Sequence, residues 1–180
     1  MPSNGEQSGR EKAETPMEPV GETSLFNSDL EAGIRAIAIL TAFFPLSLEL
    51  RQMSLYDYFI VHTGDIGGPS SLHPKISSRT GEFFIRRRTV ENGLSMMIKA
   101  GLVKEKYESA GVVYSVTEFS SAMAGLVKAS YNRRLFHCAD WLASQSRASV
   151  GGEFENSLLE RIDRWSLDLG FGDFGDEAQA

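Results

Sequence analysis

The segment from Met97 to Glu118 constrains the fold of this chain more than any other part of the sequence. A helical pattern runs into Gly101, and glycine allows the left-handed turn by which a chain leaves a helix. Two β-prone runs follow around the turn Ser109-Ala110-Gly111, which predicts a β-hairpin. Thr117 then stands where a residue can cap the next helix. The segment therefore predicts a helix, a projecting hairpin and a second helix in close succession.

Alternating residues define the two faces of the expected hairpin. In its first strand, residues 103–107, Lys104 and Lys106 fall on one face. In its second strand, residues 112–116, apolar residues recur at every other position. This order of elements resembles the recognition helix, wing and following helix of a winged-helix domain. We therefore expect a mainly α fold with a small β-hairpin, built as a winged-helix core plus a C-terminal helical extension.

Apolar residues at helical spacing predict the remaining elements. The first helix is expected over residues 29–44, with Asn27 or Ser28 as its cap. Leu30 should lie on its apolar face, and Pro45 should end it. A second helix is expected over residues 49–63, with Gly64 as its C-cap, and a long loop over residues 64–81 should follow it. A third helix is expected over residues 82–100, and another after Thr117, with Phe119, Met123, Leu126 and Val127 as its apolar stripe. The last two helices should cover a stretch through Leu135 and Leu142 and residues 153–169.

The chain is expected to divide into four parts along its length. They are a disordered N-terminal tail (residues 1–24), a winged-helix domain (25–129), a C-terminal helical extension (130–169) and an acidic tail (170–180). The net charge of −6 hides a segregation, since both tails are acidic. Residues 75–106 instead hold eight Lys and Arg against three Glu, which favours an anionic partner such as nucleic acid or an acidic protein surface. A solvated helix face is the alternative interpretation.

Bulk properties narrow the class of protein. No apolar run approaches the roughly 18 residues of a membrane span, and the N-terminal segment is too polar for a signal peptide. The sequence contains a single cysteine, Cys138, which cannot form an internal disulfide. We expect a cytoplasmic protein that contacts no membrane and uses no cofactor.

Six basic residues in the central region are the candidates for binding DNA or a partner protein. They are Arg86, Arg87, Arg88, Lys99, Lys104 and Lys106. The three consecutive arginines span about 200° of arc on a helix, so they cannot all face one way. One of them is expected to pair with Glu82 or Glu91, which leaves two for phosphates or acidic side chains.

His62, Asp65 and His73 form a second candidate group, on a helix end and the loop after it. These side chains can bind zinc, but a structural zinc site needs four protein ligands and no cysteine lies nearby in the sequence. We expect hydrogen bonds from them to order the loop, and no metal. His137 and Cys138 are adjacent on a helix and point in different directions, so we expect a buried cysteine rather than a catalytic pair.

A longer pattern connects these segments. It comprises Phe26-Asn27-Ser28-Asp29, Ile34-Arg35-Ala36, the run from Tyr58 to Asp65, Gly68-Pro69, Ser71 to Pro74, Gly81-Glu82, Arg86-Arg87, Glu91, Gly93-Leu94 and Gly101-Leu102-Val103. The pattern is similar to that of the middle component of bacterial ABC-three-component systems, over roughly residues 26–145. The Lamassu antiphage systems look like members of this group.

The resemblance implies a non-enzymatic accessory subunit with two partners, an SMC-like coiled-coil ATPase and an effector nuclease. Such a subunit would dock on the ATPase and help couple DNA sensing to effector control, in defence against phages or plasmids. The family pattern offers no catalytic residues that could be transferred to this chain.

Two other functions stay open on the sequence alone. A winged-helix protein can be a DNA-binding transcription regulator, acting as a homodimer on an operator. The long expected loop between the second and third helices argues against it, because major-groove readout needs a tight helix-turn-helix geometry. An enzyme that uses His62, Asp65 and His73 is the remaining alternative.

Overall fold

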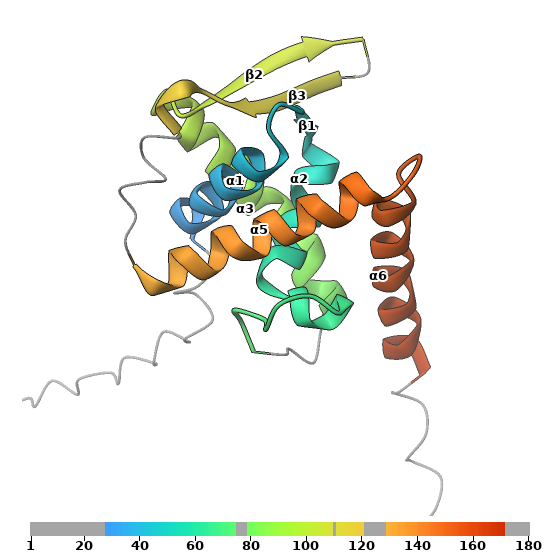
Figure 1. Cartoon of the computed structure of the whole chain (residues 1–180). Helices are drawn as coiled ribbons and strands as arrows, with labels where there is room; N and C mark the ends of the chain where they lie inside the picture. Colours follow the sequence, from blue (N-terminus) through green and yellow to red (C-terminus); the bar gives the residue numbers. More distant parts are fainter. Residues whose placement is uncertain (1–27, 75–78, 110, 121–128, 172–180) are drawn as a thin grey trace, which may run out of the picture.

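The computed structural model describes residues 28–74, 79–109, 111–120 and 129–171 of the 180-residue chain. Its elements are α1 (Asp29–Phe43), β1 (Leu48–Glu49), α2 (Leu50–Val61), the 3₁₀ helix η2 (Thr63–Ile66), α3 (Arg79–Lys99), β2 (Val103–Glu108), β3 (Gly111–Val116), α5 (Ser130–Ala148) and α6 (Glu153–Phe171). The fold is mainly helical, with a three-stranded antiparallel sheet at one end (Figure 1). Within these ranges, no helix combines the length and the apolar character that a membrane crossing requires.

Helix α1 is the centre of the fold, and its start follows from Ser28. The Ser28 hydroxyl accepts a hydrogen bond from the Glu31 backbone N–H at 3.3 Å, and the Glu31 carboxylate accepts one from the Ser28 N–H at 3.1 Å. This reciprocal capping box satisfies two N–H groups that the helix leaves open. Of the two caps that the sequence allowed, Ser28 is the one used.

The predicted apolar face of α1 is wrong at its first turn. Leu30 is 53% exposed. The buried side of this turn passes instead through Ala32 and Gly33, and the helix is covered further along by α3 and α5. From Arg35 to Leu40 every side chain is buried, so α1 is enclosed on more than one side.

Helices α1 and α3 approach closely at two glycines. A Cβ atom on Gly93 would lie 2.6 Å from the backbone nitrogen of Gly33 and 2.8 Å from the carbonyl oxygen of Asp29. Real Cβ atoms do not approach backbone atoms this closely, so the contact requires glycine. This pair fixes the spacing of the two helices that carry Arg35 and Arg86.

The β-hairpin is confirmed, with strands β2 and β3 paired so that Val103 lies opposite Val116. The sheet also contains a strand that the sequence did not predict. Strand β1 pairs with the other side of β3, placing Leu48 opposite Tyr114, and the strand order is β1-β3-β2. A strand of two residues has no alternation to detect, so only the tertiary structure reveals it.

The connection between α2 and α3 begins and ends earlier in the chain than predicted, and it contains the 3₁₀ helix η2. Helix α2 ends with His62 as its C-cap, so the assignment of that role to Gly64 is wrong. Gly64 lies inside η2, and the left-handed glycine is Gly67, with φ 81°, which ends η2. Helix α3 already begins at Arg79, three residues before the predicted start.

Helices α5 and α6 pack on the rest of the chain. Helix α5 crosses α1 and α2, and α6 lies against α2 and α3 (Figure 1). The predicted stripe of α6 faces the core, with Leu158 and Ile162 buried and Phe154 and Trp165 half-buried. The C-terminal helical extension therefore shares one core with the preceding helices.

The helix predicted after Thr117 is present at residues 118–120, but one of its side chains departs from the prediction. The Thr117 hydroxyl donates to the carbonyl oxygen of Gly101 at 2.8 Å, which ties the end of β3 to the end of α3. Phe119, predicted to lie in an apolar stripe, is 66% exposed. The other three members of that stripe, Met123, Leu126 and Val127, lie outside the described residues, as do both predicted tails except for Gly170 and Phe171.

Candidate functional site

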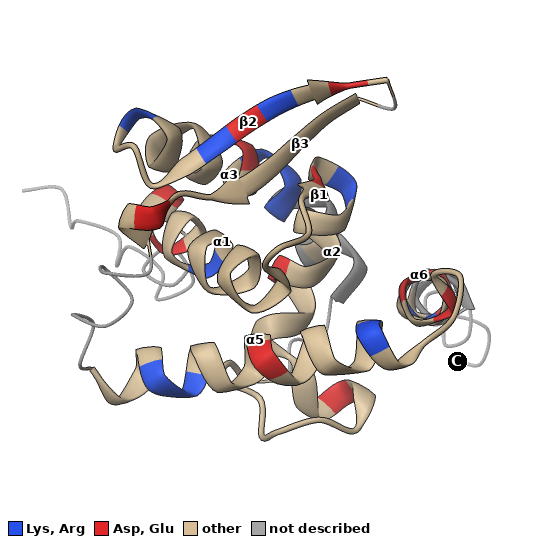
Figure 2. Ribbon diagram, turned by 45° about the horizontal axis from the view of Figure 1, so that its top comes forward, with Lys and Arg blue, Asp and Glu red and all other residues tan. Residues whose placement is uncertain are grey.

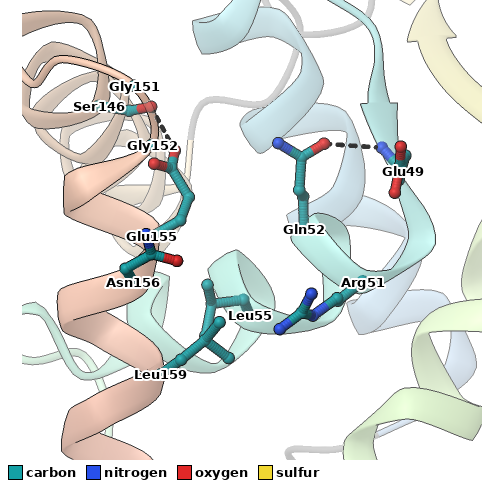
Figure 3. Close-up of a pocket in the computed structure, with 10 residues that line it drawn as sticks. All are labelled: Glu49, Arg51, Gln52, Leu55, Ser146, Gly151, Gly152, Glu155, Asn156 and Leu159. Atoms are coloured by element: carbon teal, nitrogen blue, oxygen red, sulfur yellow. Dashed lines mark hydrogen bonds between the residues drawn. The ribbon is translucent and has the colours of Figure 1, made fainter.

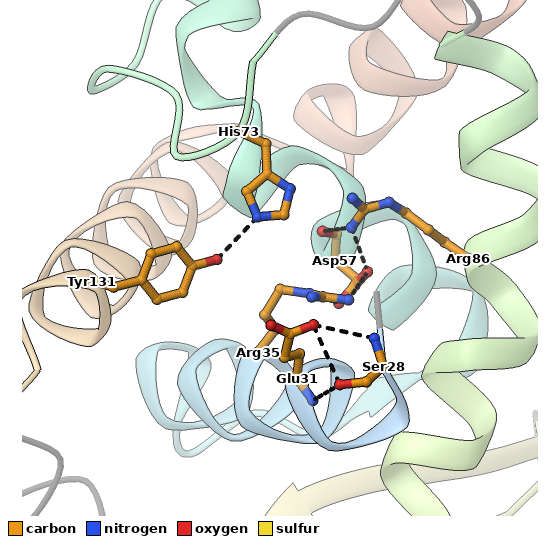
Figure 4. Close-up of polar contacts among 7 residues, drawn as sticks. All are labelled: Ser28, Glu31, Arg35, Asp57, His73, Arg86 and Tyr131. Atoms are coloured by element: carbon orange, nitrogen blue, oxygen red, sulfur yellow. Dashed lines mark hydrogen bonds and ion pairs between the residues drawn. The ribbon is translucent and has the colours of Figure 1, made fainter. Parts of the chain in front are cut away.

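A buried charge network joins three helices around Asp57. The Nε and Nη2 atoms of Arg35 on α1 donate to the two Asp57 carboxylate oxygens at 2.6 and 3.2 Å. The Nη1 atom of Arg86 on α3 donates to Oδ2 of the same carboxylate at 3.0 Å and to the Asp57 carbonyl oxygen at 3.2 Å. Figure 4 shows both guanidinium groups converging on this one residue of α2. The network therefore cross-links α1, α2 and α3.

The placement of Arg86 corrects a sequence prediction. Arg86 was a candidate for binding DNA or a partner, but its side chain is 1% exposed and cannot reach a ligand at the surface. Its guanidinium also lies 5.8 Å from the centre of the Tyr58 ring, within the range of a cation–π contact. Burial lowers the pKa of Arg35, but the Asp57 carboxylate outweighs that effect and raises it overall, so Arg35 stays charged.

The neighbouring arginines on α3 lie in a different environment. Arg87 is 65% exposed and forms an ion pair with Glu91, with 3.7 Å between Nε and Oε1. This confirms that one of the three arginines pairs with Glu91. Arg88 and Lys99 are also exposed, at the middle and at the end of α3. Their binding role stays a prediction.

The hairpin carries two further basic candidates on its outward surface. Lys104 and Lys106 are exposed and, two residues apart on β2, lie on the same face (Figure 2). Lys106 Nζ lies 3.0 Å from a carboxylate oxygen of Glu108 on the same strand. Tyr107, between Lys106 and Glu108 in the sequence, is 76% exposed. The hairpin β2–β3 therefore presents two cations and an aromatic ring to solvent.

The loop candidates serve to order the chain between α2 and α3. His62 is buried, with its ring 4.8 Å from that of Tyr58 and 6.1 Å from that of His73. His73 Nε2 lies 3.1 Å from the Tyr131 hydroxyl on α5, shown in Figure 4. The Asp65 carbonyl oxygen accepts from Arg161 on α6 at 2.9 Å. These contacts join the loop to α2, α5 and α6.

The described residues around this loop contain neither a cluster of metal ligands nor an exposed cysteine. Among the described residues, no three His, Cys, Asp or Glu side chains come together as ligands for a metal ion. Cys138 is buried as predicted, and its Sγ accepts a hydrogen bond from the Thr63 hydroxyl at 3.5 Å. Burial raises the pKa of the Cys138 thiol, which disfavours the reactive thiolate, and the adjacent His137 is exposed.

Sequence reasoning missed the residues at the centre of the charge network. Arg35 entered the sequence analysis only within the pattern Ile34-Arg35-Ala36, and Asp57 was not among the candidate residues. The available signal was the same in both cases, because a charged residue within an otherwise buried helix face needs an opposite charge nearby. Their separation of 22 residues left the partner unknown.

A protein family matches most of the chain. Residues 25–168 match the family model "ABC-three component (ABC-3C) system Middle Component 2". The chain belongs to this family. The match begins three residues before the Ser28 cap and continues into α6, so the family region includes this last helix, which the sequence resemblance over roughly residues 26–145 had left out. A search of the curated proteins and a search of the solved structures found no match.

Membership gives this middle component a place in a multi-subunit system. It implies partnership with the other components of an ABC-three-component system and suggests an accessory subunit. The matched range contains the charge network, the loop residues His62, Asp65 and His73, and the hairpin β2–β3, so each of these belongs to the family region of the chain.

Proposed function

We propose that this middle component is a non-enzymatic accessory subunit that docks on an SMC-like coiled-coil ATPase. There it helps couple DNA sensing to the control of an effector nuclease, in a Lamassu-type defence system against phages or plasmids. The family match over residues 25–168 is the observation that carries the proposal. The ATPase and the nuclease are the partners that the family resemblance of the sequence implies.

The order of the elements supports a winged-helix unit as the docking module. Helix α1, strand β1, helices α2 and α3, and the hairpin β2–β3 follow one another, with sheet order β1-β3-β2. In this arrangement α3 takes the position of the recognition helix and the hairpin that of the wing. A partner or DNA would then meet the exposed basic residues of these two elements, which are Arg87, Arg88 and Lys99 on α3 and Lys104 and Lys106 on the hairpin.

A non-enzymatic role is supported by how the polar side chains are used. Asp57 is occupied by two arginines, His62 is stacked inside the core, and Cys138 is a buried thiol. Each of these stabilises the fold, and none lines the cavity between α2 and α6 described below.

Co-purification tests the proposal. The tagged chain is expressed together with its neighbouring genes, and the purified material is resolved by mass. A stable complex with a large coiled-coil ATPase is expected. A lone homodimer that binds a promoter fragment would contradict the proposal and favour the transcription regulator.

Charge reversal on the wing then tests whether the basic surface is the contact. Arg86 is unsuitable for this purpose because it is buried, so the variant is Lys104→Glu/Lys106→Glu. We expect roughly 10-fold weaker binding to the ATPase or to DNA, since opposed like charges at an interface are costly. Arg134→Glu on α5, an exposed cation on a different element, is the control and should bind like the wild type. Equal binding by both variants would remove the wing from the interface.

A further inference from the structure

A cavity of about 410 Å³ lies between the start of α2 and the start of α6. Glu49, Arg51 and Gln52 line one side, and Glu155, Asn156 and Leu159 line the other (Figure 3). A cavity of this size is large enough for a short segment of another chain. None of the candidate residues found from the sequence lines it, so it is separate from the basic surface and from the loop.

Glu155 is held in a fixed position at this cavity. Its Oε1 atom accepts from the Ser146 hydroxyl on α5 at 2.5 Å and from the Tyr56 hydroxyl on α2. Burial raises the pKa of Glu155, but the hydrogen bonds from Ser146 and Tyr56 outweigh that effect and lower it overall. Glu155 also lies in the first turn of α6, where the helix dipole favours a negative charge. The cavity therefore contains a carboxylate that is ionised at neutral pH and does not need to reorganise to receive a cation.

The other lining residues favour the same kind of occupant. Glu49 adds a second carboxylate, against the single cation of Arg51. In the view of Figure 3, Glu155 lies near the Gly151-Gly152 turn, and Arg51 lies at the other end beside Leu55 and Leu159. The two leucines offer an apolar surface to the stem of a long side chain, while the carboxylate end suits its charged head.

We infer that this cavity receives a lysine or arginine side chain from a partner subunit of the complex. The charge of the lining residues selects a basic occupant, and the apolar floor beside them selects one with a long aliphatic stem. This site would place α2 and α6 against the partner, on elements other than the wing. The inference rests on the proposed function, because it requires a partner subunit to exist.

A matched pair of substitutions at an exposed lining residue tests the charge selection. Asn156→Lys puts a cation into the cavity, and we expect it to weaken binding to the partner by about 10-fold or more. Asn156→Glu adds a third carboxylate and should bind as tightly as the wild type or up to about 10-fold more tightly. Ser157→Lys, the adjacent exposed residue that does not line the cavity, is the control and should leave binding unchanged.

A photo-crosslink identifies the occupant directly. A photoreactive phenylalanine analogue at position 156 of the full chain, in the assembled complex, should form an adduct with a partner peptide that contains lysine or arginine at or beside the linked residue. The same analogue at position 157 should give much less of that adduct.

The outcomes separate the two proposals. If the wild type binds no partner subunit, the proposed function and this inference are both wrong. If the wild type binds but Asn156→Lys binds equally well, or if position 156 yields no partner adduct, this inference alone is overturned. Weaker binding by Asn156→Lys with an adduct to a basic peptide supports it. Melting curves of all three variants should match the wild type, since both substituted residues are exposed.

Discussion

The charge network around Asp57 and the hairpin β2–β3 both contain paired basic and acidic side chains, but in opposite surroundings. In the network, Arg35, Asp57 and Arg86 are each no more than 2% exposed, and their hydrogen bonds join three helices. On the hairpin, the Lys106–Glu108 pair is formed within one strand, and Lys106 is 72% exposed. Water and salt screen the Lys106–Glu108 pair. The network around Asp57 is buried, where charges interact strongly and an unpaired charge is costly.

Because the charges are buried in the network and exposed on the hairpin, the two regions have different roles. The removal of one partner from the network would leave a buried charge without compensation, so the network holds the helices in register. The surface pairs contribute little to stability and leave their cations accessible to another molecule. Arg86 and Arg87 are neighbours in the sequence, yet one belongs to each class.

The largest effect is expected from Asp57→Asn, which removes the carboxylate that both arginines share. We expect a loss of about 3–5 kcal/mol in the free energy of unfolding, because two guanidinium groups are then buried against a neutral amide. Urea denaturation followed by circular dichroism measures it. A loss below about 1 kcal/mol would mean that the network does not hold the helices together.

The adjacent arginines give the most direct comparison. Arg86→Met should cost about 2–4 kcal/mol, less than Asp57→Asn, because Arg35 still pairs with the carboxylate. Arg87→Met should stay within about 0.5 kcal/mol of the wild type, since its partner Glu91 is exposed. Equal costs for the two variants would contradict the contrast drawn between buried and exposed pairs.

Glu155 is an intermediate case, half-buried between α2, α5 and α6. Glu155→Gln should cost about 1–2 kcal/mol at neutral pH, because two hydrogen bonds lose their charged acceptor. Since its pKa is lowered in the folded state, the wild type gains this stability above the ordinary glutamate pKa of 4.5 and loses it as the pH falls through the lowered value. The difference in stability between the wild type and Glu155→Gln should therefore vanish in acid. Thermal melts at several pH values measure this difference, and one that persists in acid would contradict the prediction.

The smallest effect is expected on the hairpin β2–β3. Lys106→Gln removes the pair with Glu108 and should change the free energy of unfolding by less than about 0.5 kcal/mol. Added salt should reduce even this difference, since the pair is exposed. A melting temperature clearly below that of the wild type, unaffected by salt, would show that the hairpin charges stabilise the fold after all.

The extent of sequence prediction differs between the fold and the candidate sites. The hairpin, the glycine after α3, the buried Cys138 and the core face of α6 were predicted because each depends on local periodicity or on one residue type. The exposed positions of Leu30 and Phe119 were not, because periodicity indicates that a helix has an apolar face but does not say how much of it another element covers.

The sequence by itself determined which segments become the long helices and the two hairpin strands, where the basic residues gather, and the family to which the chain belongs. Only the tertiary structure decided that Arg86 turns inward to Asp57 while Arg87 turns outward, and that Glu155 meets Tyr56 and Ser146 at a cavity. The physical reason is distance along the chain. Helical and strand patterns repeat within a few residues, whereas a buried charge is neutralised by whichever opposite charge the packing of helices brings within about 3 Å.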